Sequence, residues 1–414
     1  MSKKFLAKYP ALTLASLAGI CLSGFVSMTQ AQQVYPMANA TVQPVNDGFY
    51  VPPSATTLAT KLPGTVLRYR AIPNTTYSAR VSQAYQLMFR TTDGKGMPTA
   101  AVTTLLIPKT APASARKLLS YQAMYDSLQL NCTPSALTVN GKLFEKGNVN
   151  KALDAGVLVV LTDYEGLQSQ WVAGMNTAHG VLDGIRAAQK FSKSGLNNTS
   201  PVALMGYSGG GHATAWANEV QPEYAPEMNL VGVSMGGLPV NPKHAAEKVD
   251  GGLFAAMYFG AVVGMSRAYP ETNLMDYVTA DGAAMVKDIS GRCLMGTVEG
   301  QPEMLTPYVF KKSSKYWKSP DFLNLPEIKR IIDDNIMGSR MPKAPMYIYE
   351  GVLDEVMPIA DVDALVKNYC AAGLSVDYNR IATGDHLLLA VSPGKGMDFV
   401  MDRLNGKTAN SNCP

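Results

Sequence analysis

The chain has 414 residues, of which 47% are hydrophobic and 16% are charged, and its formal net charge is +4. This composition is that of a globular protein with a large core, and it excludes a disordered or fibrous chain. Its lysines and arginines are scattered rather than gathered into a basic stripe, so we expect no nucleic-acid partner.

The N-terminal segment is typical of a secretory signal peptide. Three lysines in the first eight residues precede an apolar run over residues 11–28, and small residues follow just before Gln32. We therefore expect residues 1–31 to be removed during export to the periplasm or the medium. A permanent membrane anchor is the alternative, but a span usually needs ~20 apolar residues. No other segment is apolar enough to cross a membrane, so none is expected after cleavage.

Four cysteines remain after this segment is removed: Cys132, Cys293, Cys370 and Cys413. In an exported chain an even number suggests two disulfides, for which three pairings are possible. Four buried free thiols are the alternative, which an oxidising compartment disfavours. No C-x-x-C pair occurs and no histidine is near them in sequence, so we expect no metal site.

The next part of the chain changes from an irregular arm to a regular alternation. Residues 32–66 are rich in Pro, Ala and Thr and are expected to lie over the surface. Residues 81–89 and 100–107 are predicted to form an antiparallel hairpin across a turn rich in Gly and Asp. Further strands are predicted at residues 117–124, 156–164, 201–205, 229–235, 344–351 and 375–382, and helices at residues 176–192, 212–220, 359–371 and 394–406. This alternation predicts an α/β fold with a mostly parallel sheet and helices on both faces.

Residues 240–342 interrupt the alternation and are mostly helical in pattern, with many methionines and aromatic residues. The simplest organisation is one α/β core, made of residues 32–239 and 343–414, that carries residues 240–342 as a helical cap insertion. We see no internal repeat.

A candidate nucleophile lies in the stretch ALMGYSGGG, residues 203–211. Ser208 falls between a predicted strand and a predicted helix, and Gly206 and Gly210 complete the pattern G-x-S-x-G. In that pattern glycines permit a turn so tight that the serine hydroxyl is exposed above the sheet. A structural turn is the alternative, because so short a motif also recurs by chance.

A serine nucleophile needs a base, and histidine has the right pKa near neutrality. Only His386 follows the last predicted strand, where α/β-hydrolase folds place their base. We interpret the other three histidines, His179, His212 and His244, as ordinary polar or core residues. His212 is on the same helix as Ser208, four residues later, so its side chain should be carried away from the hydroxyl.

The acid of such a triad should follow the preceding strand, and Asp354 lies there with Glu355 beside it. Either carboxylate could hold the imidazole tautomer and stabilise its charge. The order Ser208, Asp354, His386 is that of α/β-hydrolases. An oxyanion hole is also needed; the N–H of Gly209 is one natural donor, and residues 125–127 follow the strand that normally provides the second.

Several longer stretches resemble the secretory lipase family of yeast and bacterial enzymes, of the Candida lipase A type within the α/β-hydrolase superfamily. They are LPGTVLRYR, YQAMYDSLQLNCTPS, VVLTDYEG, GYSGGGHATAWANEVQPEYAPEMNLVGVSMGG, YEGVLDEVMP and GDH, and they extend over residues 62–405. The cap cannot be aligned by eye to a family member, so the resemblance implies no acyl-chain length.

The resemblance implies a Ser208–Asp354–His386 triad, an oxyanion hole formed by Asp126 and Gly209, and an acyl-binding cap at residues 240–342. It also implies disulfides Cys132–Cys293 and Cys370–Cys413. Asp126 would donate through its backbone N–H or through a protonated side chain, because a charged carboxylate would repel an oxyanion. We also expect bulky side chains at Gly260 or Gly264 in the cap to narrow an acyl tunnel.

We therefore expect an exported serine carboxylester hydrolase that acts on lipid esters, makes transient contact with lipid interfaces, and needs neither metal nor cofactor. The first alternative is an esterase for short-chain, acetylated or polyester substrates. A peptidase on the same fold is less favoured, because no β-propeller or amine-recognition element is evident. A pseudo-hydrolase that binds a lipid or a partner without turnover is disfavoured by the intact set of triad residues.

Overall fold

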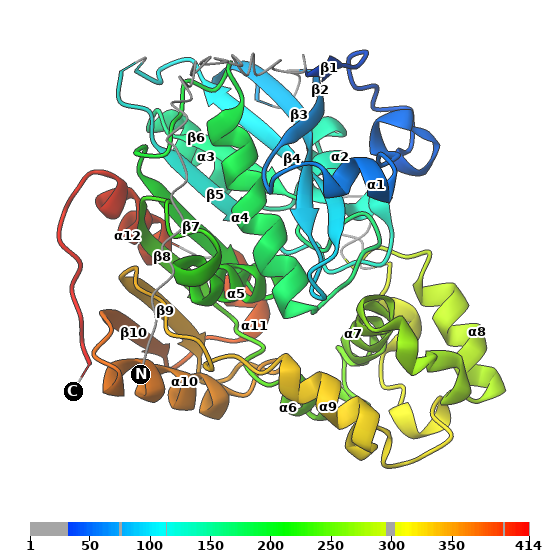
Figure 1. The fold of residues 1–414 in the computed structure, drawn as a ribbon. Coiled ribbons are helices and arrows are strands. Elements are labelled where there is room, and N and C mark those ends of the chain that lie inside the picture. Colours follow the sequence, from blue (N-terminus) through cyan, green and yellow to red (C-terminus); the bar gives the residue numbers. More distant parts are fainter. Residues whose placement is uncertain (1–31, 74–76, 113, 295–302, 392–393, 414) are drawn as a thin grey trace, which may run out of the picture. The chain divides into compact units, whose positions relative to one another are not determined.

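One mixed sheet organises the chain (Figure 1). The computed structural model describes residues 32–73, 77–112, 114–294, 303–391 and 394–413, so the expected signal peptide lies outside the described residues. The strand order is β1-β2-β3-β4-β6-β5-β7-β8-β9-β10. The strands are β1 (Gln33–Val34), β2 (Val66–Ala71), β3 (Val81–Thr92), β4 (Pro98–Pro108), β5 (Leu118–Gln122), β6 (Leu158–Thr162), β7 (Val202–Tyr207), β8 (Leu230–Gly236), β9 (Met346–Gly351) and β10 (Val376–Ile381).

The predicted hairpin and the predicted parallel strands are both present. Strands β2, β3, β4 and β6 pair antiparallel in that order, whereas β6, β5, β7, β8, β9 and β10 are parallel. The buried parallel strands bring their carboxyl ends to one edge, where ligands of open α/β sheets bind. This is the α/β-hydrolase arrangement that the sequence predicts.

Alternate residues of the central strands face two apolar layers. Leu118 and Val160 pack with helices α4 (Gly174–Lys190), α5 (Gly209–Tyr224) and α10 (Ile359–Ala371) on one face. Leu119 and Val159, their sequence neighbours, pack with α3 (Lys146–Asp154) and α12 (Gly394–Leu404) on the other. This period of two is the reason why both faces of the sheet are covered.

The N-terminal arm is more deeply integrated than expected. The sequence pattern did not predict β2, nor β1, which pairs with it at the edge of the sheet. Phe49 and Tyr50 are buried together with Leu58 of α1 (Ala55–Ala59). Two short helices after β5, α2 (Pro134–Val139) and α3, were also not predicted. The patterns of these segments are present but short: β2 alternates over six residues, and α3 buries Val149, Ala152 and Leu153 at helical spacing.

The segment between β8 and β9 contains the helices α6 (Pro242–Val249), α7 (Ala255–Ala268), α8 (Ala280–Ile289) and α9 (Pro326–Asp334). Figure 1 draws them in yellow-green to yellow, beside the sheet. They enclose an apolar cluster of their own, which also includes Trp171 and Met357 from outside this segment. Among the described residues, no helix is long and apolar enough to span a membrane.

Candidate active site

Ser208 lies at the sharp turn between β7 and α5. Its backbone has φ 55° and ψ −123°, in a region that non-glycine residues rarely occupy. A Cβ on Gly206 would lie 2.2 Å from the Gly210 carbonyl oxygen, and a Cβ on Gly210 would lie 1.9 Å from the Gln122 carbonyl oxygen. The turn therefore requires glycine at both positions, which is the physical content of the G-x-S-x-G pattern.

The structure brings Ser208, His386 and Asp354 together, although 178 residues separate the serine from the histidine. His386 Nε2 lies 2.8 Å from Ser208 Oγ, and His386 Nδ1 lies 2.7 Å from Asp354 Oδ2. All three side chains are buried. His386 is the first residue of α11 (His386–Val391), and Tyr207 donates a hydrogen bond of 3.0 Å to its carbonyl oxygen.

Asp354, rather than Glu355, contacts the imidazole. Its Oδ1 accepts hydrogen bonds from the N–H groups of Val356 and Met357, at 2.8 and 2.6 Å. Burial alone would raise the pKa of Asp354, but the hydrogen bond and the positive charge of His386 outweigh it and lower this pKa. Glu355 instead accepts the backbone N–H of His386 at 2.9 Å.

The other three histidines are not hydrogen-bonded to this group. His179 lies 3.2 Å from the Thr92 carbonyl oxygen and stacks on Tyr224, and exposed His244 pairs with Asp361 at 2.9 Å. His212 is closer to the site than expected, because it lines the same pocket as Ser208. Burial lowers the pKa of His212 to about 3, so this imidazole stays neutral.

The carboxyl group of Asp126 lies against Gly209, the residue after the serine. Asp126 is buried with φ 37°, and a Cβ on Gly209 would lie 1.7 Å from Asp126 Oδ1. Burial raises the pKa of Asp126 to about 7, although the charge of His386 and hydrogen bonds from the Gly209 backbone and the Trp171 side chain oppose that rise. Only glycine leaves room for this carboxyl group at the start of α5.

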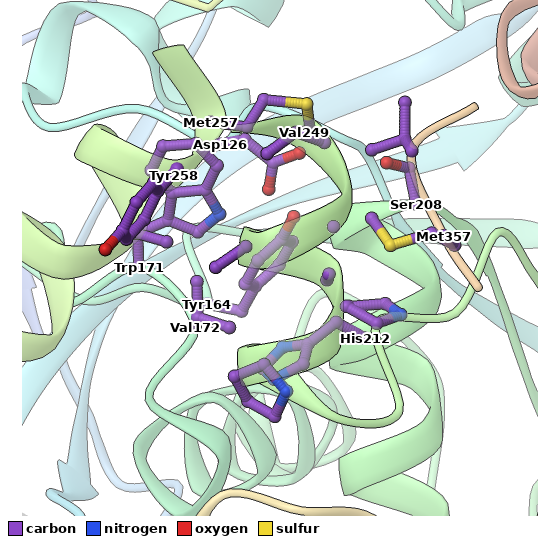
Figure 2. Close-up of a pocket in the computed structure, with 17 residues that line it drawn as sticks. Asp126, Tyr164, Trp171, Val172, Ser208, His212, Val249, Met257, Tyr258 and Met357 are labelled. Atoms are coloured by element: carbon purple, nitrogen blue, oxygen red, sulfur yellow. The ribbon is translucent and has the colours of Figure 1, made fainter. Parts of the chain in front are cut away.

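The pocket above Ser208 is apolar over most of its lining (Figure 2). Sequence patterns had not indicated Tyr164, Trp171 and Val172, which line it from the loop after β6 and the segment leading to α4. Beyond the sheet, Met257, Tyr258 and Ala261 of α7 line it as well. A signal for Tyr164, Trp171 and Val172 was absent, because a pocket wall is assembled from segments with no shared periodicity.

Comparison with known proteins shows what kind of protein has this site. The sequence profile of the family described as "Secretory lipase" matches residues 133–412. The chain belongs to the secretory lipase family. Lipase A of Arthroderma benhamiae is 35% identical to this chain over 407 residues, which cover 92% of this chain and 84% of that protein. The crystal structure of Candida antarctica lipase A in its closed state superposes with a TM-score of 0.84 and 31% identity, covering 91% of this chain and 89% of that one.

Another similar protein is named "Probable inactive lipase MT1628", from Mycobacterium tuberculosis, and is 32% identical, covering 88% of this chain and 83% of that protein. As a member of the secretory lipase family, our chain is a carboxylic ester hydrolase of the lipase and esterase class, with ester or lipid substrates.

Among the residues that the structure describes, no three His, Cys, Asp or Glu side chains are grouped so that they could hold a metal ion.

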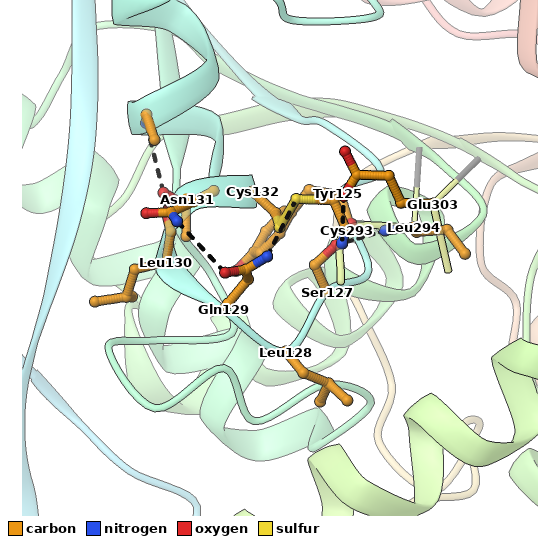
Figure 3. Close-up of a disulfide and its surroundings, with 12 residues drawn as sticks. Tyr125, Ser127, Leu128, Gln129, Leu130, Asn131, Cys132, Cys293, Leu294 and Glu303 are labelled. Atoms are coloured by element: carbon orange, nitrogen blue, oxygen red, sulfur yellow. Dashed lines mark hydrogen bonds between the residues drawn. A yellow bond between two sulfur atoms is a disulfide. The ribbon is translucent and has the colours of Figure 1, made fainter. Parts of the chain in front are cut away.

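This secretory lipase contains two disulfides, Cys132–Cys293 and Cys370–Cys413, the pairings that the resemblance implies. The first joins the loop that carries Asp126 to the helical segment (Figure 3). Around it the backbone N–H of Leu294 donates to Ser127 Oγ at 3.0 Å, and Gln129 Nε2 donates to the Gly291 carbonyl oxygen at 2.7 Å. Disulfides agree with a secreted protein.

Proposed function

We propose that this secretory lipase hydrolyses carboxylic esters through a Ser208–His386–Asp354 triad. The observation that carries this proposal is the unbroken chain of hydrogen bonds, 2.7 Å from Asp354 to His386 and 2.8 Å from His386 to Ser208. Because Nδ1–H is donated to Asp354, the lone pair of Nε2 is directed at the serine hydroxyl, which is the tautomer a general base needs. The low pKa of His212 makes that histidine a poor substitute.

In the first half-reaction, Ser208 Oγ attacks the ester carbonyl carbon while its proton passes to His386 Nε2. The bond from that carbon to the alcohol oxygen then breaks, and the departing oxygen takes the proton from His386. Water attacks the acyl-enzyme by the same steps, which releases the acid and returns a proton to Ser208. Asp354 stabilises the imidazolium during both halves.

The tetrahedral intermediates need two donors for their negative oxygen. The N–H of Gly209, at the N-terminus of α5, is the first. We infer that the protonated side chain of Asp126 is the second, because burial raises its pKa to about 7 and leaves a large part of it neutral at physiological pH. The alternative, that its backbone N–H donates, makes a different prediction, which is given in the Discussion.

We infer that residues 240–342 act as a cap that receives the acyl chain, over a core formed by residues 32–239 and 343–414. The pocket above Ser208 shares Tyr258 and Ala261 with a second apolar cavity. That cavity continues to Ile328 and Ile332 of α9. An apolar path that extends from Ser208 to α9 suits a long acyl chain better than an acetyl group. This favours lipid esters over the short-ester alternative.

Support for contact with a lipid interface comes from an apolar rim made of Val352, Leu353, Leu387, Leu388 and Val391. These side chains are exposed, Leu353 by 61% and Leu387 by 54%, and they flank Asp354 and His386 in sequence. Exposed apolar clusters beside a site mark an interaction surface. We expect the double substitution Leu387→Ser and Leu388→Ser to lower turnover of emulsified triglyceride while hydrolysis of a soluble butyrate ester is retained. Equal losses on both substrates would show that these residues do not contact a lipid interface.

A fluorophosphonate probe tests the central proposal. It should label the wild-type chain on Ser208 and leave Ser208→Ala unlabelled, whereas an unlabelled wild type would favour a binding protein without turnover.

A series of nitrophenyl esters, together with an emulsified triglyceride, tests the acyl-chain preference. It should show higher kcat/KM for long chains than for acetate.

The N-terminus of the mature protein tests export. The first residue of the protein recovered outside the cytoplasm should be Gln32, and retention of residues 1–31 would favour an anchor.

A further inference from the structure

Glu350 is a buried carboxyl group beside the candidate triad that the proposed mechanism does not use. It is the second-last residue of β9 and precedes Asp354 by four residues. Its side chain has no exposed surface. Oε2 accepts a hydrogen bond of 3.1 Å from the Leu238 backbone N–H, whereas Oε1 has no donor among the described residues. The two carboxyl groups, Glu350 and Asp354, lie in hydrogen-bonding contact.

The surroundings of Glu350 do not favour a negative charge. The phenols of Tyr207 and Tyr349 are near, but they lie on the opposite face of the sheet. The groups that face Glu350 are Asp354 with its partner His386, the phenol of Tyr378, and the backbone of Leu238 and Gly351. Arg380 is its register partner on β10, but that side chain is exposed and pairs with Asp363 at 3.3 Å. A buried carboxylate without a cation costs several kcal/mol unless it holds a proton, by rough estimates.

Proton sharing within this pair has a definite direction. Burial raises the pKa of Glu350 well above its ordinary value, and the charge of Asp354 raises it further. The pKa of Asp354 is lowered by His386. When two carboxyl groups are this close, the first proton to leave comes from the one with the better-stabilised anion, which here is Asp354.

We propose that Glu350 is a positioning residue whose carboxyl O–H donates a hydrogen bond to the Asp354 carboxylate and so fixes the group that orients His386. This inference rests on the triad proposed above. Asp354 then has donors on every side, namely two backbone N–H groups, the imidazole N–H and Glu350. Loss of the last donor would leave a buried anion under-stabilised and freer to turn away from the imidazole.

Two variants separate the donor from a purely structural role. Glu350→Gln keeps an acceptor for Leu238 and an N–H donor for Asp354, so its kcat on a soluble nitrophenyl ester should stay within about threefold of wild type. Glu350→Leu removes the donor and should lower kcat by about tenfold or more with little change in KM, because only the imidazolium-forming steps depend on it. Glu219→Gln is the matched control: Glu219 is also buried with a raised pKa, but it is bonded to Tyr369 and Gly338 rather than to the triad. Its kcat should equal that of wild type.

A stability measurement tests the proton itself. The unfolded chain loses the Glu350 proton above the ordinary glutamate pKa, whereas the folded chain keeps it, so the stability that this group contributes to the wild type falls as pH rises from about 5 to 8. Glu350→Gln cannot titrate, and the gap between its denaturation midpoint and that of the wild type should shift in favour of the variant over this range. A constant gap would overturn the protonated state, and wild-type kcat in Glu350→Leu would overturn the donor role. If Glu350→Leu does not fold, a loss of kcat in Glu350→Gln of much more than threefold, with wild-type kcat in Glu219→Gln, overturns the proposal by itself. Absence of probe labelling at Ser208 in the wild type would instead refute the triad, and the stability comparison would still decide the protonation of Glu350.

Discussion

In the proposed triad, Ser208 and His386 act as a unit in which each side chain needs the other. We expect Ser208→Ala and His386→Ala each to remove nearly all ester turnover, and the double variant to be no worse than either, because losses within such a unit are not additive. Measured kcat values, with circular dichroism as the check on folding, decide this.

His179→Asn is the control, since its imidazole contacts only backbone carbonyls and Tyr224, away from the pocket. It should keep wild-type kcat. His212 lines the pocket, so His212→Asn should change KM more than kcat. If ester turnover is retained without His386 but lost without His212, the general base is His212 rather than His386.

If the Asp126 side chain is an oxyanion donor, its ionisation should make the activity depend on pH. Its pKa of about 7 means that a donating side chain is lost as pH rises through neutrality, so kcat/KM should fall there. Asp126→Asn keeps a donor that cannot ionise and should abolish this fall while retaining partial activity. Asp126→Leu should lose roughly 100-fold or more, the usual effect of one missing oxyanion donor. A mild effect of Asp126→Leu on kcat would show that the backbone N–H is the donor.

Helix α7 presents different residues to the cavity and to the protein interior. Gly260 and Gly264 do not border the tunnel as the sequence had suggested: a Cβ on either would lie 2.0 or 2.6 Å from Trp171. Tryptophan at these positions should therefore destabilise the fold. Ala261 is the position that lines both cavities, and Ala261→Trp should shift selectivity from long to short acyl esters with acetate hydrolysis retained.

The control for that experiment is Ala284→Trp, on an exposed position of α8 away from the cavities. It adds the same bulk to the helical segment and should leave the chain-length profile unchanged. If Ala261→Trp folds and also leaves the profile unchanged, the cap is structural and the short-ester reading becomes the better one.

The two disulfides join distant parts of the whole molecule and differ in what they hold. Cys132–Cys293 closes a separation of 161 residues and Cys370–Cys413 one of 43. In the chain-entropy description each contributes ~2–4 kcal/mol, and the longer loop contributes about 1 kcal/mol more. Replacing the first pair by alanine should lower the thermal midpoint more than replacing the second.

Only the first replacement should also lower kcat, because Cys132–Cys293 and the Leu294–Ser127 hydrogen bond connect the helical segment to the loop that carries Asp126. Kinetics and melting curves of the two double-alanine variants give the comparison. Equal midpoints with equal kcat would contradict this division of roles.

How much the sequence could predict depended on the range of each interaction. The alternation of Leu118 with Leu119 and the turn around Ser208 are local, because strand period and glycine sterics involve neighbouring residues, and so the α/β class and the nucleophile turn were readable. Most of the arm at residues 32–66 is exposed or half-buried, but the burial of Phe49 and Tyr50 was not predicted, since it depends on distant strands.

By itself the sequence determined the class of fold, the order of the candidate triad residues and, through its resemblance, the family. The residues alone left Asp354 and Glu355 as alternatives, and the resemblance favoured Asp354. Only the folded chain places the Asp354 carboxylate on the imidazole of His386 and that of Glu355 on its backbone N–H. It also sets the raised pKa values of Asp126 and Glu350, since a pKa responds to burial and to charges brought close from other parts of the chain. The sequence contains those groups, but only the folded chain sets the distances between them.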